Sequence, residues 1–203
     1  MMDEFEIELP GGLRRAGRAD SALLGAITAD AFRDDPFNHW TFGNETAMRH
    51  TFTSYARHVY TQRGYCCLAG AEAAAMWLAP GINKELPFHA TPGLAASLLL
   101  NGGPAALMRA MTADAAIVAQ KPQTPHVYLF TIAVRPGLQG QGYGRRLMQP
   151  VLEACDRAGL PAYLESSNPA NLGFYGSLGI KAAGEIHAGP SAPPMTPMWR
   201  EPR

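Results

Sequence analysis

A glycine-rich loop between a strand and a helix constrains the fold of this chain more than any other feature of the sequence. Residues 126–134 are rich in β-branched and aromatic side chains and predict a strand, which Arg135-Pro136 ends. The loop Gln139-Gly140-Gln141-Gly142-Tyr143-Gly144 follows and leads into a helix expected to run to Ala158. Loop amides and the positive end of a helix dipole together bind anions, so the sequence predicts an anion site here.

The remaining segments mix strands and helices, which predicts one α/β domain around a single sheet. Residues 91–119 are helical but broken at Gly102-Gly103-Pro104, and we interpret them as an inserted helical pair. Pro150 is expected to kink its helix, and Gly64 is expected to be a left-handed helix cap. The other expected elements are strands at 13–18, 65–69, 73–78, 162–165, 180–186 and 196–200, and helices at about 20–34, 44–63 and 169–178.

The composition excludes several classes of protein. Lys and Arg number 17 against 17 Asp and Glu, so no net charge draws the chain to nucleic acid or an anionic membrane. Three cysteines without metal-ligand spacing argue against a disulfide framework, and no metal site is expected. No apolar run approaches the roughly 18 residues of a membrane span, and residues 1–8 are acidic where a signal peptide would be basic. We therefore expect a cytoplasmic protein without nucleic-acid or membrane partners.

Two familiar phosphate-binding loops do not fit the spacing of the glycines. A P-loop requires Gly-Lys-Ser/Thr, but Gly144 is followed by Arg145-Arg146. The dinucleotide-binding fingerprint requires a third glycine three positions after the second, where this chain has Arg145. The pattern Gln139-x-x-Gly142-x-Gly144, after Ile132-Ala133-Val134, instead resembles the pyrophosphate loop of the GNAT superfamily of N-acetyltransferases, which bind acetyl-coenzyme A (acetyl-CoA).

A second motif supports the same resemblance. Asn168-Pro169-Ala170-Asn171 and the following Tyr175 are similar to the superfamily's Asn-rich segment, and Leu178-Gly179-Ile180 is similar to its turn into the next strand, with Ile180 where Phe is commonest. The resemblance is strongest over residues 125–185 and looser over the first 90. Residues 35–40, 77–81 and 160–165 are also similar to the actinobacterial, puromycin-acetyltransferase-like branch.

The resemblance implies a single GNAT-like α/β domain over residues 1–203. It implies a mixed central sheet splayed at the strand ending near Val134, with helices on both faces and the acetyl-pantetheine arm in the gap. The implied contacts to acetyl-CoA are the backbone of Ile132, Ala133 and Val134, the pyrophosphate cradle of Gln139, Gly140, Gln141, Gly142, Tyr143, Gly144 and Arg145, and hydrogen bonds from Asn168 and Asn171. For Asn168, the alternative is a helix cap.

Tyr175 is the implied catalytic residue. The departing thiolate needs a proton, and a phenol with a pKa of about 10 is still protonated at pH 7. The alternative is that Tyr175 is an aromatic residue on a buried helix face. No general base is identified, because the polar residues of strand 126–134 are His126, Tyr128 and Thr131, without a carboxylate. Glu165, which ends a neighbouring strand, is the nearest alternative, and it is also compatible with a strand-end ion pair.

Two functions of different class fit the resemblance. The first is an enzyme that moves an acetyl group from acetyl-CoA to a primary amine by direct attack in a ternary complex, since Cys66-Cys67 and Cys155 are interpreted as core residues. The second is a non-catalytic acyl-CoA-binding or interaction module of the same fold. Residues 34–42 combine carboxylates and aromatics, so we expect them to line a site for a small-molecule amine; a solvated helix end beside core aromatics is the alternative. The chain is expected to be a monomer or homodimer.

Overall fold

A seven-stranded mixed sheet forms the centre of the molecule in the computed structural model, which describes residues 7–203. Most of the acidic start of the chain, residues 1–6, lies outside the described residues. The strand order is β1-β2-β3-β4-β5-β7-β6, and only β4 and β5 run parallel. The strands are β1 (Arg14–Arg15), β2 (Tyr65–Ala69), β3 (Ala73–Leu78), β4 (Val127–Val134), β5 (Ala162–Ser166), β6 (Lys181–Ala182) and β7 (Thr196–Arg200).

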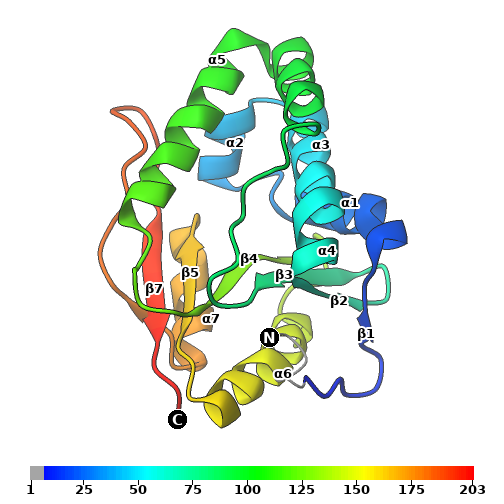
Figure 1. The fold of residues 1–203 in the computed structure, drawn as a ribbon, viewed down its shortest axis with the longest axis vertical. Helices are drawn as coiled ribbons and strands as arrows, with labels where there is room; N and C mark the ends of the chain where they lie inside the picture. The colour runs from blue at the N-terminus through cyan, green and yellow to red at the C-terminus, as the bar shows by residue number, and fades with distance from the viewer. Residues whose placement is uncertain (1–6) are drawn as a thin grey trace.

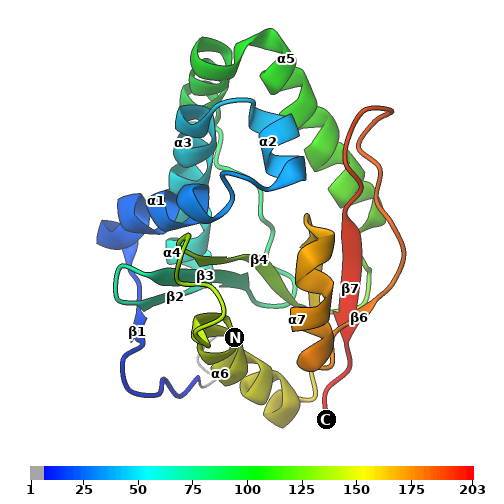
Figure 2. The ribbon, with the colours of Figure 1, turned by 180° about the vertical axis from the view of Figure 1, so that it is seen from behind.

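Helices cover both faces of this sheet, as expected. One face carries α6 and α7, and the opposite face carries α1 to α4, with α5 extending that layer (Figures 1 and 2). The helical elements are η1 (Arg18–Asp20), α1 (Ser21–Ala31), α2 (Pro36–Phe42), α3 (Glu45–Tyr55), η2 (Ala56–Tyr60), α4 (Thr61–Arg63), α5 (Thr91–Gln120), α6 (Tyr143–Ala158), η3 (Pro169–Asn171) and α7 (Leu172–Ser177). Within residues 7–203, no helix combines the length and the apolar character needed to cross a membrane.

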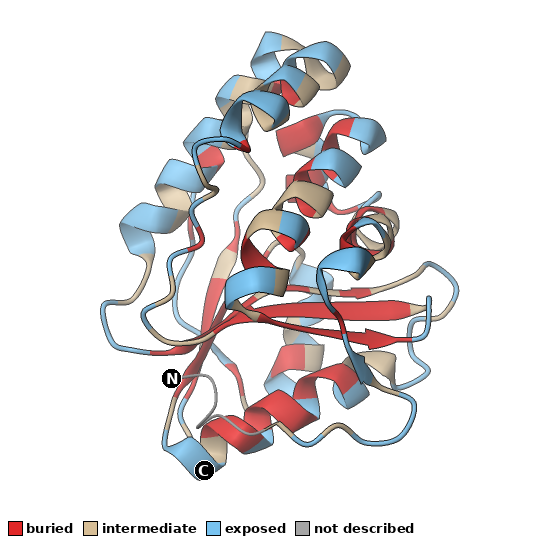
Figure 3. Cartoon of the chain, turned by 45° about the vertical axis from the view of Figure 1, so that its right-hand side comes forward, coloured by how far each residue is buried: buried red, intermediate tan, exposed pale blue. Residues whose placement is uncertain are grey.

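The two faces of the sheet bury separate cores, because side chains alternate along each strand. Leu147, Met148 and Val151 of α6 pack on one face, where their periodic spacing makes α6 strongly amphipathic. Leu24 and Ile27 of α1 pack on the other face. Figure 3 shows the central strands buried, whereas most of α5 is exposed.

A β-bulge in β4 opens the sheet. Trp77 of β3 lies opposite Leu129 and Met76 opposite Thr131, so Phe130 is an extra residue in β4. Such a bulge bends its strand and disrupts the local pairing. The parallel pairing of β4 with β5 covers only residues 127–129, and residues 130–134 have no partner on β5. The expected splay is therefore present, and it begins at the bulge.

Two local expectations differ from the structure. Gly64 is extended at φ −118° rather than left-handed, and it is needed because a Cβ there would collide with the Trp77 carbonyl. The expected strand 180–186 is reduced to β6 and a single bridge between Ile186 and Met195.

The helical stretch after β3 is confirmed as α5. Gly103 interrupts it with φ 75° and ψ 177°, directly before Pro104. Only glycine adopts this conformation without strain, and the following proline has no amide to donate to the preceding turn. α5 is therefore two helices joined at a glycine, which is the inserted pair that the sequence indicates.

Candidate active site

A cavity of about 700 Å³ lies between the splayed end of β4, the glycine loop and α7; we call it the donor cavity. It is lined by most of the residues expected to contact acetyl-CoA, namely Ile132, Val134, Gln139, Gly140, Gly142, Tyr143, Gly144, Arg145, Asn168 and Asn171, and by Tyr175. Ala133 and Gln141 are not on its wall. The Ala133 side chain is buried in the opposite core, and the Gln141 side chain turns back to the Gly137 carbonyl at 3.4 Å.

The glycine loop holds its shape through its own backbone and one glutamine. Gly137, Gly140 and Gly142 have φ of 81°, 79° and 84°, which is the left-handed region that favours glycine. The Gln139 amide group donates to the Val134 carbonyl and accepts from the Gly137 amide, both at 3.2 Å. Gln139 therefore braces the loop with its side chain and offers its backbone to the cavity.

The loop amides are available to a ligand. Among the described residues, none of the amides from Gln139 to Arg145 donates a hydrogen bond to the protein, and the ladder of α6 starts with the Arg146 amide on the Gly142 carbonyl at 3.1 Å. A Cβ added at Gly140 or Gly142 would meet no atom within 4 Å. This open cradle at a helix N-terminus fits the pyrophosphate of a coenzyme A derivative.

Gly144 and Arg145 have additional structural roles. A Cβ on Gly144 would lie 3.0 Å from the Phe174 ring, so glycine here lets α6 and α7 approach each other. The Arg145 guanidinium donates to the Ser177 hydroxyl at 2.9 Å, which ties the same two helices together. Both residues also line the donor cavity.

Asn168 is a helix cap on the wall of the donor cavity. Its side-chain oxygen accepts from the Ala170 amide at 3.0 Å and caps η3, while the residue also lines the donor cavity. This cap fixes the start of the short helical segment that carries Asn171 and Tyr175.

Tyr175 lies where the donor cavity meets a second, smaller cavity. Only 7% of the residue is exposed, and burial, with the Asp35 charge as a second cause, raises the pKa of Tyr175 above its usual value. The phenol is therefore protonated throughout the neutral pH range. A protonated hydroxyl at the junction of two cavities can supply a proton to a group leaving one of them.

The smaller cavity has a volume of about 100 Å³; we call it the amine cavity. It shares Phe32, Ile132, Asn171 and Tyr175 with the donor cavity. The rest of its apolar wall includes Phe37, Phe52, Phe130, Ile117 and Met195. Sequence analysis did not assign Phe32, Phe52, Ile117 or Met195 to a site. Phe52 and Ile117 resemble ordinary buried positions of their helices, and Phe32 and Met195 lie outside helices and strands.

Only some residues of the expected acceptor segment 34–42 lie at the two cavities in the structure. Asp35 is buried and caps α2, accepting from the Asn38 amide at 2.9 Å and from the Ser167 hydroxyl at 2.8 Å. Asp34 is exposed at the rim of the donor cavity, and Phe37 reaches the amine cavity. Phe42 instead packs in the core against Phe52, so only part of this segment borders the site.

The cysteines do not contribute a nucleophile to this site. Cys66, Cys67 and Cys155 are free and buried. Burial raises the pKa of Cys66 and Cys155 to about 12 and that of Cys67 to about 11, so the reactive thiolate form is scarce at neutral pH.

Solved structures share this fold over nearly the whole chain. The structure of "histone acetyltransferase HPA2 and related acetyltransferase" from Corynebacterium glutamicum matches with a TM-score of 0.67 and 23% identity, covering 94% of this chain and 96% of that one. The Drosophila melanogaster polyamine N-acetyltransferase, which forms N-acetylagmatine, matches with a TM-score of 0.58 and 16% identity, covering 93% and 98%. The chain therefore shares its overall fold with these solved acetyltransferase structures.

The chain belongs to the acetyltransferase (GNAT) family, whose model matches residues 72–180. An uncharacterized N-acetyltransferase of Schizosaccharomyces pombe is 27% identical over 186 residues, which cover 82% of this chain and 73% of that protein. The protein is therefore an acetyltransferase of the GNAT type, a family that uses acetyl-CoA.

Proposed function

We propose that this protein transfers the acetyl group of acetyl-CoA to a primary amine of a small molecule, by direct attack within a ternary complex. The observation that carries the proposal is the meeting of two cavities at Tyr175. A donor in the larger cavity and an amine in the smaller one would have their reacting groups side by side, which lowers the entropic cost of the reaction.

The donor would be held mainly by backbone groups. The amides of residues 139–145 would receive its pyrophosphate, and Ile132 and Val134, beyond the bulge, would lie along its pantetheine arm. Asn168 and Asn171 would add polar contacts from the opposite wall. When bound, the donor supplies an acetyl thioester, whose carbonyl carbon is the target of the amine.

Tyr175 would act as the general acid. Its hydroxyl would give a proton to the sulfur as the carbon–sulfur bond breaks, which turns a thiolate into a better leaving thiol. The raised pKa of Tyr175 keeps this proton in place until the thiolate forms.

The size of the amine cavity favours a small-molecule acceptor, because about 100 Å³ admits a slender chemical group rather than a folded segment of protein. We also propose that the chain falls in the puromycin-acetyltransferase-like branch, on the sequence of residues 35–40, 77–81 and 160–165. A cytoplasmic location and a monomeric or homodimeric state complete the proposal.

Two measurements on the same preparation test this function. Calorimetry with acetyl-CoA measures donor binding, and a thiol-release assay over a panel of primary amines, with agmatine and polyamines among them, measures turnover. We expect both binding and amine-dependent thiol release. Donor binding without thiol release for any amine would support a non-catalytic acyl-CoA-binding module instead.

A further inference from the structure

One carboxylate beside the amine cavity lacks the partners that a buried charge normally has. Glu165, near the end of β5, lines this cavity and accepts a hydrogen bond from the Tyr128 hydroxyl at 2.8 Å through Oε2. Its other oxygen, Oε1, is buried and has no hydrogen-bond partner among the described residues. A buried carboxylate is costly unless it is paired with a cation and fully hydrogen-bonded.

The nearby cations are engaged elsewhere. Lys84 forms an ion pair with Asp114 of α5 at 2.8 Å, and the Lys121 ammonium lies 5.4 Å from the centre of the Tyr128 ring. Within residues 7–203, Glu165 has no ion-pair partner, so the strand-end ion pair considered from the sequence is not formed.

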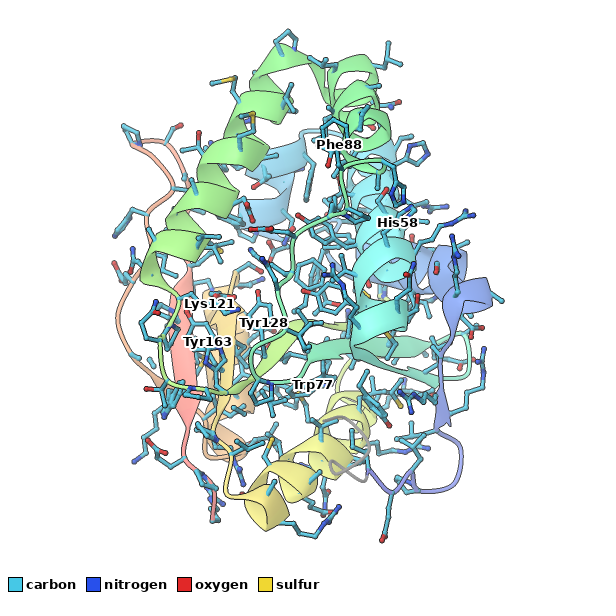
Figure 4. The ribbon with its side chains drawn as sticks, in the orientation of Figure 1. His58, Trp77, Phe88, Lys121, Tyr128 and Tyr163 are labelled. Atoms are coloured by element: carbon cyan, nitrogen blue, oxygen red, sulfur yellow. The ribbon has the colours of Figure 1, made fainter. Side chains whose placement is uncertain are left out.

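Tyrosines surround the same carboxylate on this face of the sheet. The rings of Tyr128 and Tyr163 stack with centroids 6.2 Å apart, and Figure 4 shows both residues with Lys121 over β4 and β5. The hydroxyls of Tyr163 and Tyr60 are buried without a hydrogen-bond partner among the described residues. Glu165 therefore lies among buried hydroxyl groups that lack hydrogen-bond partners, beside an otherwise largely apolar cavity.

We propose that the ammonium group of the acceptor is the missing cation: it enters the amine cavity, binds the Glu165 carboxylate and gives Glu165 the proton that it must lose before attack. This inference rests on the proposed function and adds to it both the residue that receives the amine and the shape of the substrate.

The walls of the amine cavity define that shape. Phe32, Phe37, Phe52 and Phe130 surround a volume of about 100 Å³ beside the carboxylate. Aromatic faces attract cations, and the narrow space admits an unbranched aminoalkyl arm while excluding a carbon branch next to the nitrogen. The inferred acceptor class is therefore primary amines whose nitrogen is carried on a CH₂ group.

Glu165 and Tyr175 together account for the protons that are transferred in the proposed reaction. A bound ammonium transfers one proton to Glu165, and the neutral amine then attacks the thioester carbonyl carbon. The carbon–nitrogen bond forms, the carbon–sulfur bond breaks, and Tyr175 gives its proton to sulfur. The second proton leaving nitrogen restores Tyr175, and Glu165 releases the first to solvent between turnovers, so that amide, thiol and one proton are formed.

The surroundings of Glu165 suit the transfer of a proton from the bound ammonium. Burial raises the pKa of Glu165. The Tyr128 hydroxyl, Lys84, Tyr163 and Lys121 lower this pKa. A carboxylate with a raised pKa is a stronger base than one in water. Tyr175 of α7 lines the same cavity, and Tyr60 of η2 lies in the electrostatic field of Glu165, Tyr55 and Asp114. Because the ionised form is the active one, kcat/KM should rise with pH through the pKa of Glu165.

Glu165→Gln tests the inference, with the exposed Glu153→Gln of α6 as the matched control. The probes are n-butylamine and its branched isomer sec-butylamine, at saturating acetyl-CoA. We expect Glu165→Gln to lower kcat/KM for n-butylamine by roughly 10²- to 10⁴-fold, to abolish the rise with pH through the Glu165 pKa, and to leave donor affinity unchanged. Wild type should prefer n-butylamine by about 10-fold or more, the usual effect of one misplaced carbon.

A fold control accompanies these rates. Glutamine retains an oxygen for the Tyr128 hydroxyl and removes a desolvated charge, so the melting temperature of Glu165→Gln at pH 8 should equal or exceed that of wild type. Unchanged kcat/KM and pH profile in Glu165→Gln, or equal rates for the two butylamines, would overturn the inference while the proposed function stands. Absence of thiol release by wild type with every amine tested would remove the proposed function and the inference with it.

Discussion

In the proposed reaction Tyr175 is the acid and Glu165 is the base, and burial affects the pKa of each side chain. Burial raises the pKa of both side chains. For the phenol, this keeps the proton on the oxygen at neutral pH, as an acid requires. For the carboxylate, it increases the affinity for a proton, as a base requires. One physical effect therefore produces both members of an acid–base pair.

Tyr175→Phe removes the proposed acid without changing the ring that packs in α7. We expect donor affinity to be retained and kcat to fall by roughly 10²- to 10⁴-fold, because the thiolate then leaves without a proton. Calorimetry and saturating thiol-release rates measure the two effects separately. Unchanged kcat would mean that Tyr175 has only a packing role.

Gly142→Leu would place a side chain in the open cradle and force an L residue to φ 84°. Gly81→Leu is the matched control, since Gly81 has φ 76° with no atom within 4 Å of an added Cβ and does not line the donor cavity. Both variants carry the same kind of backbone strain, and we expect only Gly142→Leu to lose acetyl-CoA binding. Calorimetry measures the dissociation constant of acetyl-CoA for both variants. Micromolar affinity in Gly142→Leu would contradict the proposed binding of the pyrophosphate by the glycine loop.

For single residues, the sequence predicts those features that depend only on nearby positions in the chain. The glycines of the loop and the position of Tyr175 after Asn168 follow from local patterns. The bond between Tyr128 and Glu165 joins residues 37 positions apart, and it depends on the parallel register of β4 and β5, which no local pattern encodes. The bracing role of the Gln139 side chain likewise depends on how the loop folds back.

The crossing of α1 and α3 positions part of the site wall. Gly25 of α1 lies against Thr53 of α3, and an added Cβ would come within 2.7 Å of the Thr53 backbone nitrogen and 2.8 Å of its Cα. The same α1 ends near Phe32, which borders both cavities. A small residue at the crossing therefore sets how close this wall approaches the sheet.

Gly25→Ala should destabilise the protein although alanine is the better helix former. Helix propensity favours alanine by about 1 kcal/mol, but overpacking against a backbone costs about 1–3 kcal/mol. We expect a net loss of up to about 2 kcal/mol in the free energy of unfolding, measured by urea titration. Gly176→Ala in α7, where an added Cβ meets no atom within 4 Å, is the control and should be neutral or stabilising. Equal stability of the two variants would contradict this packing.

α6 was predictable because one helical periodicity dominates its sequence. The bulge at Phe130 was not predictable, because an extra residue in a strand leaves no mark on the alternation of buried and exposed positions when both faces are buried.

The whole molecule has two adjoining cavities, which the proposed function assigns to donor and acceptor, and no exposed thiol among the described residues. The proposal therefore requires both substrates to be bound at once and no covalent acetyl-enzyme. Initial rates over a grid of acetyl-CoA and amine concentrations should give intersecting double-reciprocal lines, and acetyl-CoA alone should leave the mass of the protein unchanged. Parallel lines together with an acetylated protein would indicate a ping-pong route instead.

The two cavities are assembled from different parts of the chain. Most residues that line the donor cavity belong to the segment from β4 to α7. The amine cavity is also lined by residues of α2, α3, α5 and the connection before β7. Substitutions in those helices can change which amine fits without disturbing the backbone cradle for the donor. After gene duplication, one copy could change its acceptor through such substitutions. Selection could act on each substitution, because the variant would still transfer an acetyl group.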